Sequence, residues 1–196
     1  MSVGPLGEAA FRGWDADGWD DLRAIWDDLI PARESSPLFR DHDILTPQQR
    51  GWIFERRVME AFRLSGAATE HRHRNPMATD SGMLEEIDGL VFDGWQAFLV
   101  EAKYERHRVG IDPIFRLHLM AEQRPVGTLG LFFSISGFTS PAPELSERLR
   151  PIRVLLFAAK DIEWALRVGA GMMELVREKW TRAVRSGRPH SPDRRV

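Results

Sequence analysis

The carboxylates of Asp88 and Glu101 and the ammonium group of Lys103 lie near one another in the sequence and could form one polar site. Two carboxylates can converge on a single divalent cation, and a lysine beside them supplies a point charge where negative charge develops in a reaction. Oxygen ligands without a nearby histidine or cysteine favour Mg²⁺ or Mn²⁺ over Zn²⁺. The chain contains no cysteine, so thiolate metal sites and disulfides are excluded.

A β-hairpin is expected to position these three residues. Residues 84–92 and 95–104 have the composition of strands, and Asp93 and Gly94 between them are a strong signal for a two-residue hairpin loop. Paired residues share a face of the sheet, and side chains alternate between faces along each strand.

With Asp93 and Gly94 as the loop, Asp88 lies opposite Leu99, and Glu86 lies opposite Glu101. Glu86, Asp88, Glu101 and Lys103 then project from one face, with Asp88 and Glu101 as diagonal neighbours roughly 7–8 Å apart at the backbone. Like charges facing each other destabilise a sheet, and a divalent cation would remove that repulsion. The other face is apolar and is expected in the core, with Ile87, Val91, Phe98 and Val100.

A helix should precede the hairpin. Thr46 is a good N-cap and Pro47 suits the first helical position, so we expect a helix over residues 47–64 that Gly66 ends. Its apolar residues recur at helical spacing and predict a buried stripe of Ile53, Phe54, Val58, Ala61 and Phe62.

The rest of the chain predicts strands that alternate with helices. We expect a first strand at 67–74, a helix at 111–124, buried strands at 127–135 and 152–158, a helix capped by Asp161 and a last helix to about 185. A meander whose later strands are connected through helices predicts an α/β fold, with a mixed central sheet flanked by helices.

These residues together resemble the PD-(D/E)xK nuclease superfamily, which includes restriction endonucleases. The resemblance rests on Asp88 followed after twelve residues by Glu101-Ala-Lys103, and on Gly51-Trp-Ile-Phe-Glu55, which is similar to the start of the family's first helix. It covers roughly residues 47–170. The proline that gives the family its name is absent, since Ile87 stands before the first aspartate.

The resemblance implies a role for each matching residue. Asp88 and Glu101 would bind Mg²⁺, or Mn²⁺ in its place, and Glu55 would assist the metal site. Lys103 would orient the attacking water and help to deprotonate it. The reaction would be metal-dependent hydrolysis of phosphodiester bonds by an endonuclease.

Several polar residues outside this set have a functional and an ordinary interpretation. Arg106 and Arg108 could contact the nucleic-acid backbone or belong to a solvated turn. Gln123 could contact substrate or lie on a helix surface. His71 and His73 could chelate a metal, although an exposed edge strand or a phosphate-contacting strip explains them better.

Charge and composition divide the chain. Residues 1–45 contain 10 acidic and 4 basic residues and form an acidic N-terminal extension, in which Trp19, Leu22, Trp26 and Leu29 predict a helix docked on the body. Residues 46–185 form the nuclease-like domain, and residues 186–196 a basic tail without fixed structure. The remainder beyond residue 45 has 19 acidic and 23 basic residues, which is compatible with nucleic-acid binding.

The function that these expectations favour is a DNA endonuclease in restriction or anti-phage defence. The alternatives are a repair or recombination nuclease, an RNA-directed nuclease, or a nuclease-like module that binds nucleic acid or a partner without cutting. We expect a cytoplasmic protein without a membrane span, because no run approaches the roughly 18 apolar residues that one needs. A homodimer, or a partner protein that supplies specificity, is expected because cutting both strands generally needs two sites.

Overall fold

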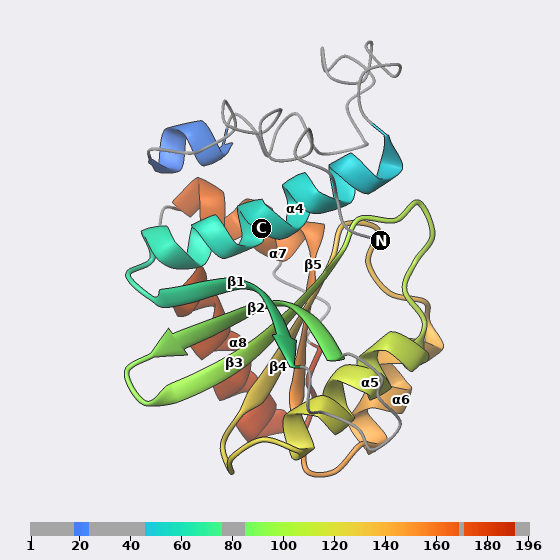
Figure 1. Ribbon diagram of the computed structural model, residues 1–196. Coiled ribbons are helices and arrows are strands. Elements are labelled where there is room, and N and C mark those ends of the chain that lie inside the picture. Colours follow the sequence, from blue (N-terminus) through green and yellow to red (C-terminus); the bar gives the residue numbers. More distant parts are fainter. Residues whose placement is uncertain (1–17, 24–45, 76–84, 169–170, 191–196) are drawn as a thin grey trace.

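A five-stranded mixed sheet forms the centre of the computed structural model, which describes residues 18–23, 46–75, 85–168 and 171–190 (Figure 1). The strand order is β1-β2-β3-β4-β5, and the first three strands are antiparallel whereas β3, β4 and β5 are parallel. The strands span β1 Ala68–Asn75, β2 Glu85–Asp93, β3 Gln96–Lys103, β4 Leu129–Ser134 and β5 Val154–Ala158.

Helices cover both faces of this sheet. The helices α5 (Ile111–Glu122) and α6 (Pro141–Arg148) pack on one face, and α4 (Pro47–Leu64), α7 (Ala159–Val168) and α8 (Met172–Ser186) on the other. Parallel strands joined through helices need such coverage, and all six residues of β4 are accordingly buried. The expected α/β class with a mixed sheet is confirmed.

Helix α4 begins and ends as its sequence predicts. The Thr46 side chain accepts a hydrogen bond from the Gln49 backbone N–H at 3.2 Å, and the Gln49 side chain accepts one from the Thr46 backbone N–H at 2.7 Å. This reciprocal capping satisfies two backbone donors that the helix itself leaves unpaired. The predicted apolar stripe is buried, and it fixes which face of α4 is turned to the sheet.

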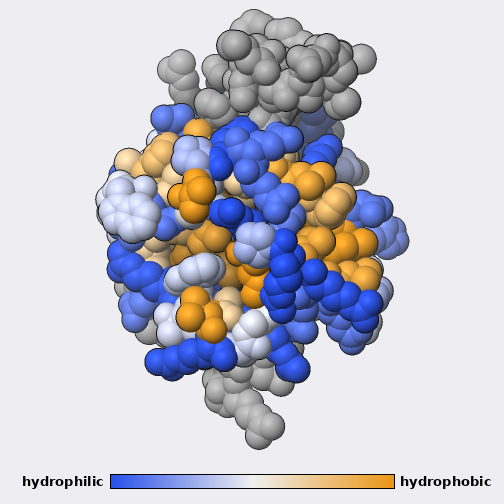
Figure 2. All heavy atoms as spheres, turned by 90° about the horizontal axis from the view of Figure 1, so that it is seen from below, coloured by the Kyte–Doolittle hydropathy of each residue, from blue (hydrophilic) through white to orange (hydrophobic). Residues whose placement is uncertain are grey.

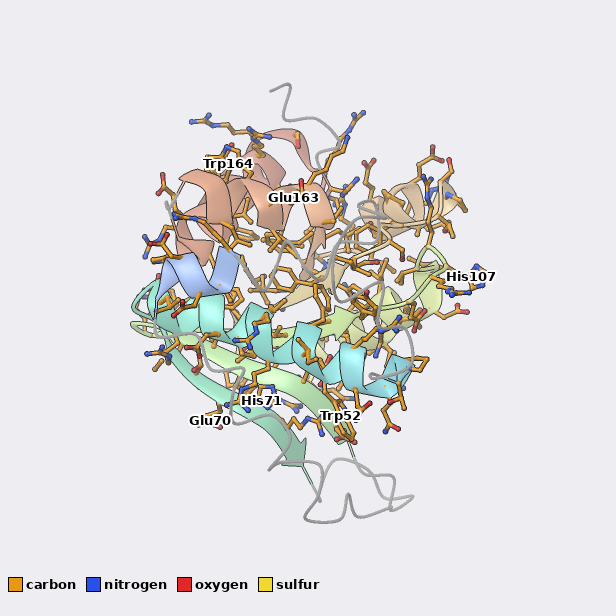
Figure 3. All side chains as sticks on the ribbon, turned by 90° about the horizontal axis from the view of Figure 1, so that it is seen from above. Trp52, Glu70, His71, His107, Glu163 and Trp164 are labelled. Atoms are coloured by element: carbon orange, nitrogen blue, oxygen red, sulfur yellow. The ribbon has the colours of Figure 1, made fainter. Side chains whose placement is uncertain are left out.

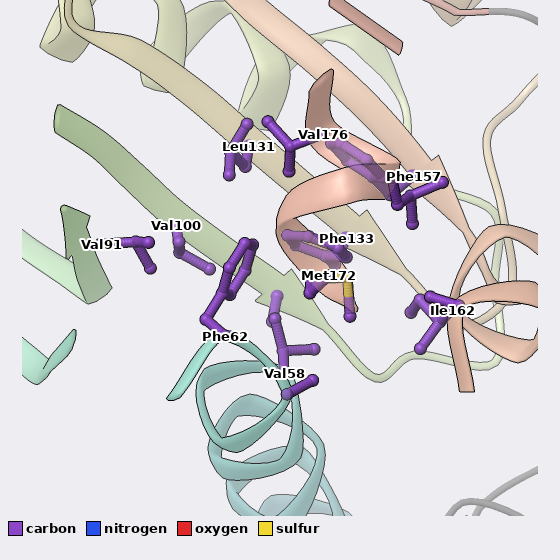
Figure 4. Close-up of a cluster of buried hydrophobic side chains, with 14 of the residues drawn as sticks. Val58, Phe62, Val91, Val100, Leu131, Phe133, Phe157, Ile162, Met172 and Val176 are labelled. Carbon is purple, nitrogen blue, oxygen red and sulfur yellow. The ribbon is translucent and has the colours of Figure 1, made fainter. Parts of the chain in front are cut away.

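Two hydrophobic clusters, one on each face of the sheet, hold the layers together. The larger cluster joins Val58 and Phe62 of α4 to strand residues such as Val100, and Figure 4 shows this packing. Within it the rings of Phe133 and Phe157 stack with centroids 4.6 Å apart. The smaller cluster lies under α5 and α6 and includes Phe132. The sheet is therefore held from both sides.

The hairpin between β2 and β3 forms where expected, but its register differs by two residues. Asp93 pairs with Gln96, so the loop consists of Gly94 and Trp95 rather than Asp93 and Gly94. Gly94 has a φ of 62°, a conformation that glycine adopts without steric cost. Asp93 stays in the strand, where its carboxylate forms an ion pair of 2.5 Å with Arg177 of α8. A shift of two residues does not by itself exchange the faces, and Val91, Phe98 and Val100 share one cluster as expected. Ile87, which was expected on the same face, packs instead in the other cluster with Leu99, beyond the point where the pairing of β2 with β3 ends.

The ends of the described chain also contact the body. In the acidic extension, Leu22 is buried in the core and the Arg23 side chain donates to the Leu166 carbonyl at 2.5 Å, while Trp26 and Leu29 lie outside the described residues. In the basic tail, the Pro189 carbonyl accepts a hydrogen bond from the Leu156 N–H of β5 at 3.3 Å. Residues 187–190 thus pack along β5, and residues 191–196 lie outside the described part.

Exposed apolar side chains gather at the hairpin end of the sheet. Trp95 in the hairpin loop is 88% exposed, and Val126, just before β4, is 93% exposed. Seen from below, this end of the molecule has hydrophobic side chains scattered among hydrophilic ones (Figure 2). None of the described helices combines the length and the apolar character needed to cross a membrane.

Candidate active site

A fork between β2 and β3 positions the first carboxylate. The pairing of the two strands ends at Gly89 and Val100, and β2 then turns away from β3 (Figure 1). Asp88 is the next residue of β2, and its Oδ2 accepts a hydrogen bond from the Ala102 N–H of β3 at 2.8 Å. The side chain of Asp88 thus replaces a backbone partner at the point where the ladder opens.

The second carboxylate and the lysine come from the same part of β3. Glu101 and Lys103 pair with Phe132 and Ser134 of β4, which places both on the face that α5 and α6 cover. Lys103 Nζ lies 2.6 Å from Glu101 Oε1, and the side chains are 30% and 9% exposed. The structure therefore brings Asp88, Glu101 and Lys103 close together at the fork.

Helix α4 brings Glu55 to this cluster. A glycine at position 89 allows the close approach, because a Cβ there would overlap Met59 Sδ of α4. Glu55 Oε2 lies 3.2 Å from the Arg72 guanidinium of β1, and that guanidinium also lies over the Trp52 ring, with Cζ 5.1 Å from its centroid. Figure 3 shows Trp52 on the edge of the molecule where α4 crosses β1.

Arg72 has an unusual backbone conformation for this position. Its φ is 53°, in the left-handed region that residues other than glycine rarely adopt. His71 pairs with Gly89 and His73 with Ile87, so Arg72 stands opposite Asp88. Strain of this kind recurs at functional sites, where the surrounding structure maintains it.

Burial and neighbouring charge raise the pKa values of Asp88 and Glu55. For Asp88, burial first and then the charges of Glu101 and Glu55 raise the pKa to about 7, against the hydrogen bond from Ala102. Burial also raises the pKa of Glu55, although the cation of Arg72 opposes this. In the absence of a cation, deprotonation of Asp88 and Glu55 is therefore disfavoured.

Lys103 is held as an ammonium ion. Burial lowers the pKa of Lys103, but the neighbouring carboxylates, Glu101 first, outweigh burial and leave the pKa above its ordinary value. In this arrangement the lysine carries a positive charge and hydrogen-bond donors beside the carboxylates.

The carboxylate oxygens of the cluster fit a hard divalent cation, although two of the three carboxylates form ion pairs within the protein. Among the described residues, no three of His, Asp and Glu are close enough to form a ready metal cluster. Glu101 instead contacts Lys103, and Glu55 contacts Arg72. Oxygen donors from Asp88, Glu101 and Glu55 suit Mg²⁺ or Mn²⁺. The raised pKa of Asp88 shows that the site favours added positive charge, so these residues fit the metal.

Of the three residues expected to bind substrate, two follow Lys103 closely in the chain and one lies elsewhere. Arg106 and Arg108 are exposed in the loop that follows β3, directly beyond Lys103. Gln123 follows α5, at the end of the helix that leads to Leu129. Because β4 begins at Leu129 and reaches the level of Lys103 only at its far end, the structure does not bring Gln123 to this cluster.

Other polar residues lie around the cluster without joining it. Glu86 is exposed in β2, and Ser134 is fully buried, with its hydroxyl donating to the Gly137 carbonyl at 2.9 Å. His118 is buried in α5, with Nε2 3.3 Å from a Glu122 carboxylate oxygen. Burial and the nearby arginines lower the pKa of His71, and the side chain of His73 lies outside the described part.

Sequence reasoning missed Arg72 and its partner Trp52. The residues His71 to Arg74 were interpreted as an exposed or phosphate-contacting strip, and nothing local to the sequence marks Arg72 as special. The pairing with Glu55 depends on α4 crossing β1, a contact between segments that are far apart in the sequence. The spacing of Trp52 and Glu55, which fall on one side of α4, was the available signal.

The chain matches the model of one known family. The model of a family described as restriction endonuclease (Mrr_cat) matches residues 49–163, a segment that contains Glu55, Asp88, Glu101 and Lys103. A search of curated proteins gave no match.

Four chains of solved structures match. One is the crystal structure of a protein of unknown function, AF1548, with 13% identity and a TM-score of 0.43, covering 69% of this chain and 78% of that one. Another is the MspJI restriction endonuclease in complex with a 27-mer oligonucleotide, with 16% identity and a TM-score of 0.35, covering 87% of this chain. This chain spans 34% of that enzyme's length.

Proposed function

Since the chain belongs to the restriction endonuclease family whose model matches residues 49–163, we propose that it is an endonuclease that hydrolyses phosphodiester bonds of DNA with the help of a divalent cation. The observation that carries the proposal is the fork between β2 and β3. It brings Asp88, Glu101 and Lys103 close together, within reach of Glu55.

The proposed ligands of the cation are Asp88 and Glu101, with Glu55 assisting. When bound, Mg²⁺ or Mn²⁺ would polarise the phosphate and acidify water. Asp88 is already oriented by the Ala102 N–H, which leaves its second carboxylate oxygen available. Glu101 would turn from Lys103 toward the cation.

Lys103 would then be released from its ion pair with Glu101. Its ammonium group would orient the water that attacks phosphorus and stabilise the negative charge that develops there. The raised pKa of Lys103 supports this electrostatic role over that of a general base. The bond from phosphorus to the leaving oxygen would break as the new bond to water forms, a proton from the attacking water would pass to solvent, and the leaving oxygen would take a proton from solvent.

DNA is the proposed substrate, and restriction or anti-phage defence is the proposed setting, because both follow the family description. The second candidate is a nuclease-like module that binds nucleic acid without cutting. One observation favours it: the described carboxylates do not form a ready metal cluster.

A cleavage assay separates the two candidates. We would incubate the protein with plasmid, single-stranded DNA and RNA, in Mg²⁺, Mn²⁺ or chelator, beside the variants Lys103→Ala and Asp88→Ala. Metal-dependent nicking that falls by about a hundredfold or more in both variants is expected for an enzyme. Arg116→Ala, which removes an exposed charge from the middle of α5, is the control and should cut normally.

Circular dichroism would show that each variant is folded. Binding without cleavage in every metal would sink the enzyme and favour the non-cutting module. Loss of RNA without loss of DNA would move the proposal to an RNA-directed nuclease.

A further inference from the structure

A second polar pocket lies beside the carboxylate cluster, and none of the site residues described above except Arg108 lines it. Its volume is about 690 Å³, within the usual range for small-molecule sites. The loop after β4 forms one wall, the beginning of α7 forms another, and residues 188 and 190 close a third side. The polar lining residues on which the inference rests are Arg108, Ser136, Ser140, Lys160 and Arg188.

The pocket and Lys103 lie at the C-terminal ends of the parallel strands, on the same face of the sheet. Lys103 pairs with Ser134, and Ser134 pairs with Ala158, which lines the pocket. Neighbouring strands are about 4.8 Å apart, so the pocket begins roughly 10 Å from Lys103. One strand of B-DNA advances about 3.4 Å per nucleotide, which places the pocket within about three nucleotides of the scissile phosphate.

The charges of the pocket favour an anionic ligand. Arg108, Lys160 and Arg188 contribute three cations, against the carboxylates of Glu144 and Glu147. Arg188 Nε lies 3.8 Å from a Glu147 oxygen, so part of the negative charge is already compensated. The positive ends of two helices, α6 and α7, also lie at the pocket and add to its field.

The pocket is too large for a phosphate alone, and one wall is apolar. Phe138 contributes to this wall but is only 8% exposed, because its ring packs edge-on against His190 and against Phe132 of the core. Ile135, Pro143 and Ala158 complete the apolar lining. The flat face of a base can cover an apolar wall of this kind, and such a contact does not depend on which base is present.

The wall is rigid because the loop after β3 clamps it. The Val109 N–H donates to the Gly137 carbonyl at 3.0 Å, and the Thr139 N–H donates to the Val109 carbonyl at 2.9 Å. The Ser136 hydroxyl donates to the His107 carbonyl at 2.7 Å. The pocket is thus preformed, and its wall is bonded to the segment that follows Lys103.

We propose that this pocket binds one unstacked nucleotide of the substrate strand, with the base against the apolar wall and a flanking phosphate at the rim formed by Arg108 and Lys160. The inference rests on the proposed function, and it makes the pocket a determinant of where the strand is cut. A base within a continuous stack could not enter, so the strand must be single or locally opened.

Abasic scanning tests the proposal by binding rather than by cleavage. We would measure the affinity of Lys103→Ala protein for a fluorescent single-stranded oligodeoxynucleotide and for copies that carry one abasic site at successive positions. Loss of the base that enters the pocket should weaken binding by roughly tenfold at one position, and by much less elsewhere.

A variant that fills the pocket provides the second arm. Ser140 is exposed at the pocket and its side chain makes no helix-capping bond, so Ser140→Trp should block the pocket and abolish the positional effect. Val126→Trp adds the same ring at the hairpin end and should leave the effect intact. If Ser140→Trp does not fold, Lys160→Ala replaces it and should weaken binding several-fold more than Arg116→Ala.

The outcomes distinguish this inference from the proposed function. If no abasic position matters, or if Ser140→Trp responds to each position as its parent does, the pocket is not a nucleotide site, whatever the cleavage assay shows. If the positional effect is present but the protein with Lys103 intact cuts nothing in any metal, the pocket stands and the endonuclease falls.

Discussion

At the scale of single residues, Asp88 connects the geometry of the fork with the chemistry of the site. Its carboxyl group is buried beside two others, and its pKa is raised to about 7 from an ordinary value of 3.8. In the folded protein it therefore holds a proton between those pH values, whereas the unfolded chain does not. The stability of the metal-free protein should accordingly decline as the pH rises from about 4 to about 7.

The raised pKa of Asp88 predicts that metal binding releases protons. A carboxylate must be deprotonated to bind a cation, so affinity for Mn²⁺ should rise with pH and level off above about 8. Calorimetric titration near pH 6, in two buffers of different ionisation enthalpy, should show up to about one proton released, and Asp88→Asn should release fewer. Equal release by both proteins would contradict the assignment.

Replacement of Arg72 should lower the activity of the protein without lowering its stability. Replacement by glycine would remove strain of about 1 kcal/mol at a φ of 53°, so Arg72→Gly should melt no lower than the parent. It would also remove the partner of Glu55, and cleavage should fall by about tenfold.

The matched control for Arg72 is Arg63→Ala. This change breaks an exposed ion pair with Glu60 in the last turn of α4, the helix that also carries Glu55. This variant should cut normally, since exposed ion pairs contribute little. Thermal unfolding and cleavage rates would be measured on the same preparations. Full activity of Arg72→Gly would show that Glu55 needs no partner.

At the scale of elements, the approach of α5 to β4 determines where the loop after Lys103 can run. Gly130 permits this approach, because a Cβ there would lie 2.7 Å from Leu117 Cγ and 3.1 Å from Val154 Cγ2. Leu117 is 1% exposed and has no room to move. The close packing of α5 on this face of the sheet thus depends on the absence of a side chain at position 130.

Substitution of Gly130 should therefore cost stability, unlike substitution of a glycine that has open space around it. Gly130→Ala should lower the free energy of unfolding by about 1–3 kcal/mol through overpacking. Gly51→Ala, in α4 with nothing within 4 Å of its Cβ, should raise it by about 0.5–1 kcal/mol. Urea unfolding measures both, and Leu117→Val should recover part of the Gly130→Ala loss.

At the scale of the whole molecule, one buried ion pair joins the last three elements. Lys179 of α8 is 5% exposed, and its Nζ donates to Asp161 Oδ2 of α7 at 2.7 Å and to the Leu156 carbonyl of β5 at 2.5 Å. Asp161 also accepts from the Ala158 N–H at 2.8 Å. Asp161, which the sequence predicted as the cap of α7, is therefore a residue of the first turn of that helix, because α7 begins at Ala159.

Removal of one partner should weaken the fold as a unit. Asp161→Ala would leave Lys179 buried and unpaired and should lower stability by roughly 3 kcal/mol at neutral pH. Burial lowers the pKa of Lys179 in the folded state, so this loss is largest below that pKa and should shrink as pH rises toward 10.5. Thermal unfolding at pH 7 and 10 tests the trend, and Asp161→Ala with Lys179→Met should recover most of the stability.

The sequence by itself determined the elements and the strands that carry the site residues. Capping signals at Thr46 and apolar periodicity are local, and a period of two keeps Glu101 and Lys103 on one face even when the hairpin register shifts by two. The α/β class followed from the order of these elements, so the likeness to nucleases could be stated before any coordinates.

Only the tertiary structure decided what surrounds those residues. The choice between Asp93-Gly94 and Gly94-Trp95 as the loop depended on pairing with neighbouring strands and on Arg177 of α8. The contact of Arg72 with Glu55 joins segments that local patterns cannot align. The raised pKa of Asp88 has the same origin, because burial and the proximity of charges from three separate elements exist only once the chain is packed.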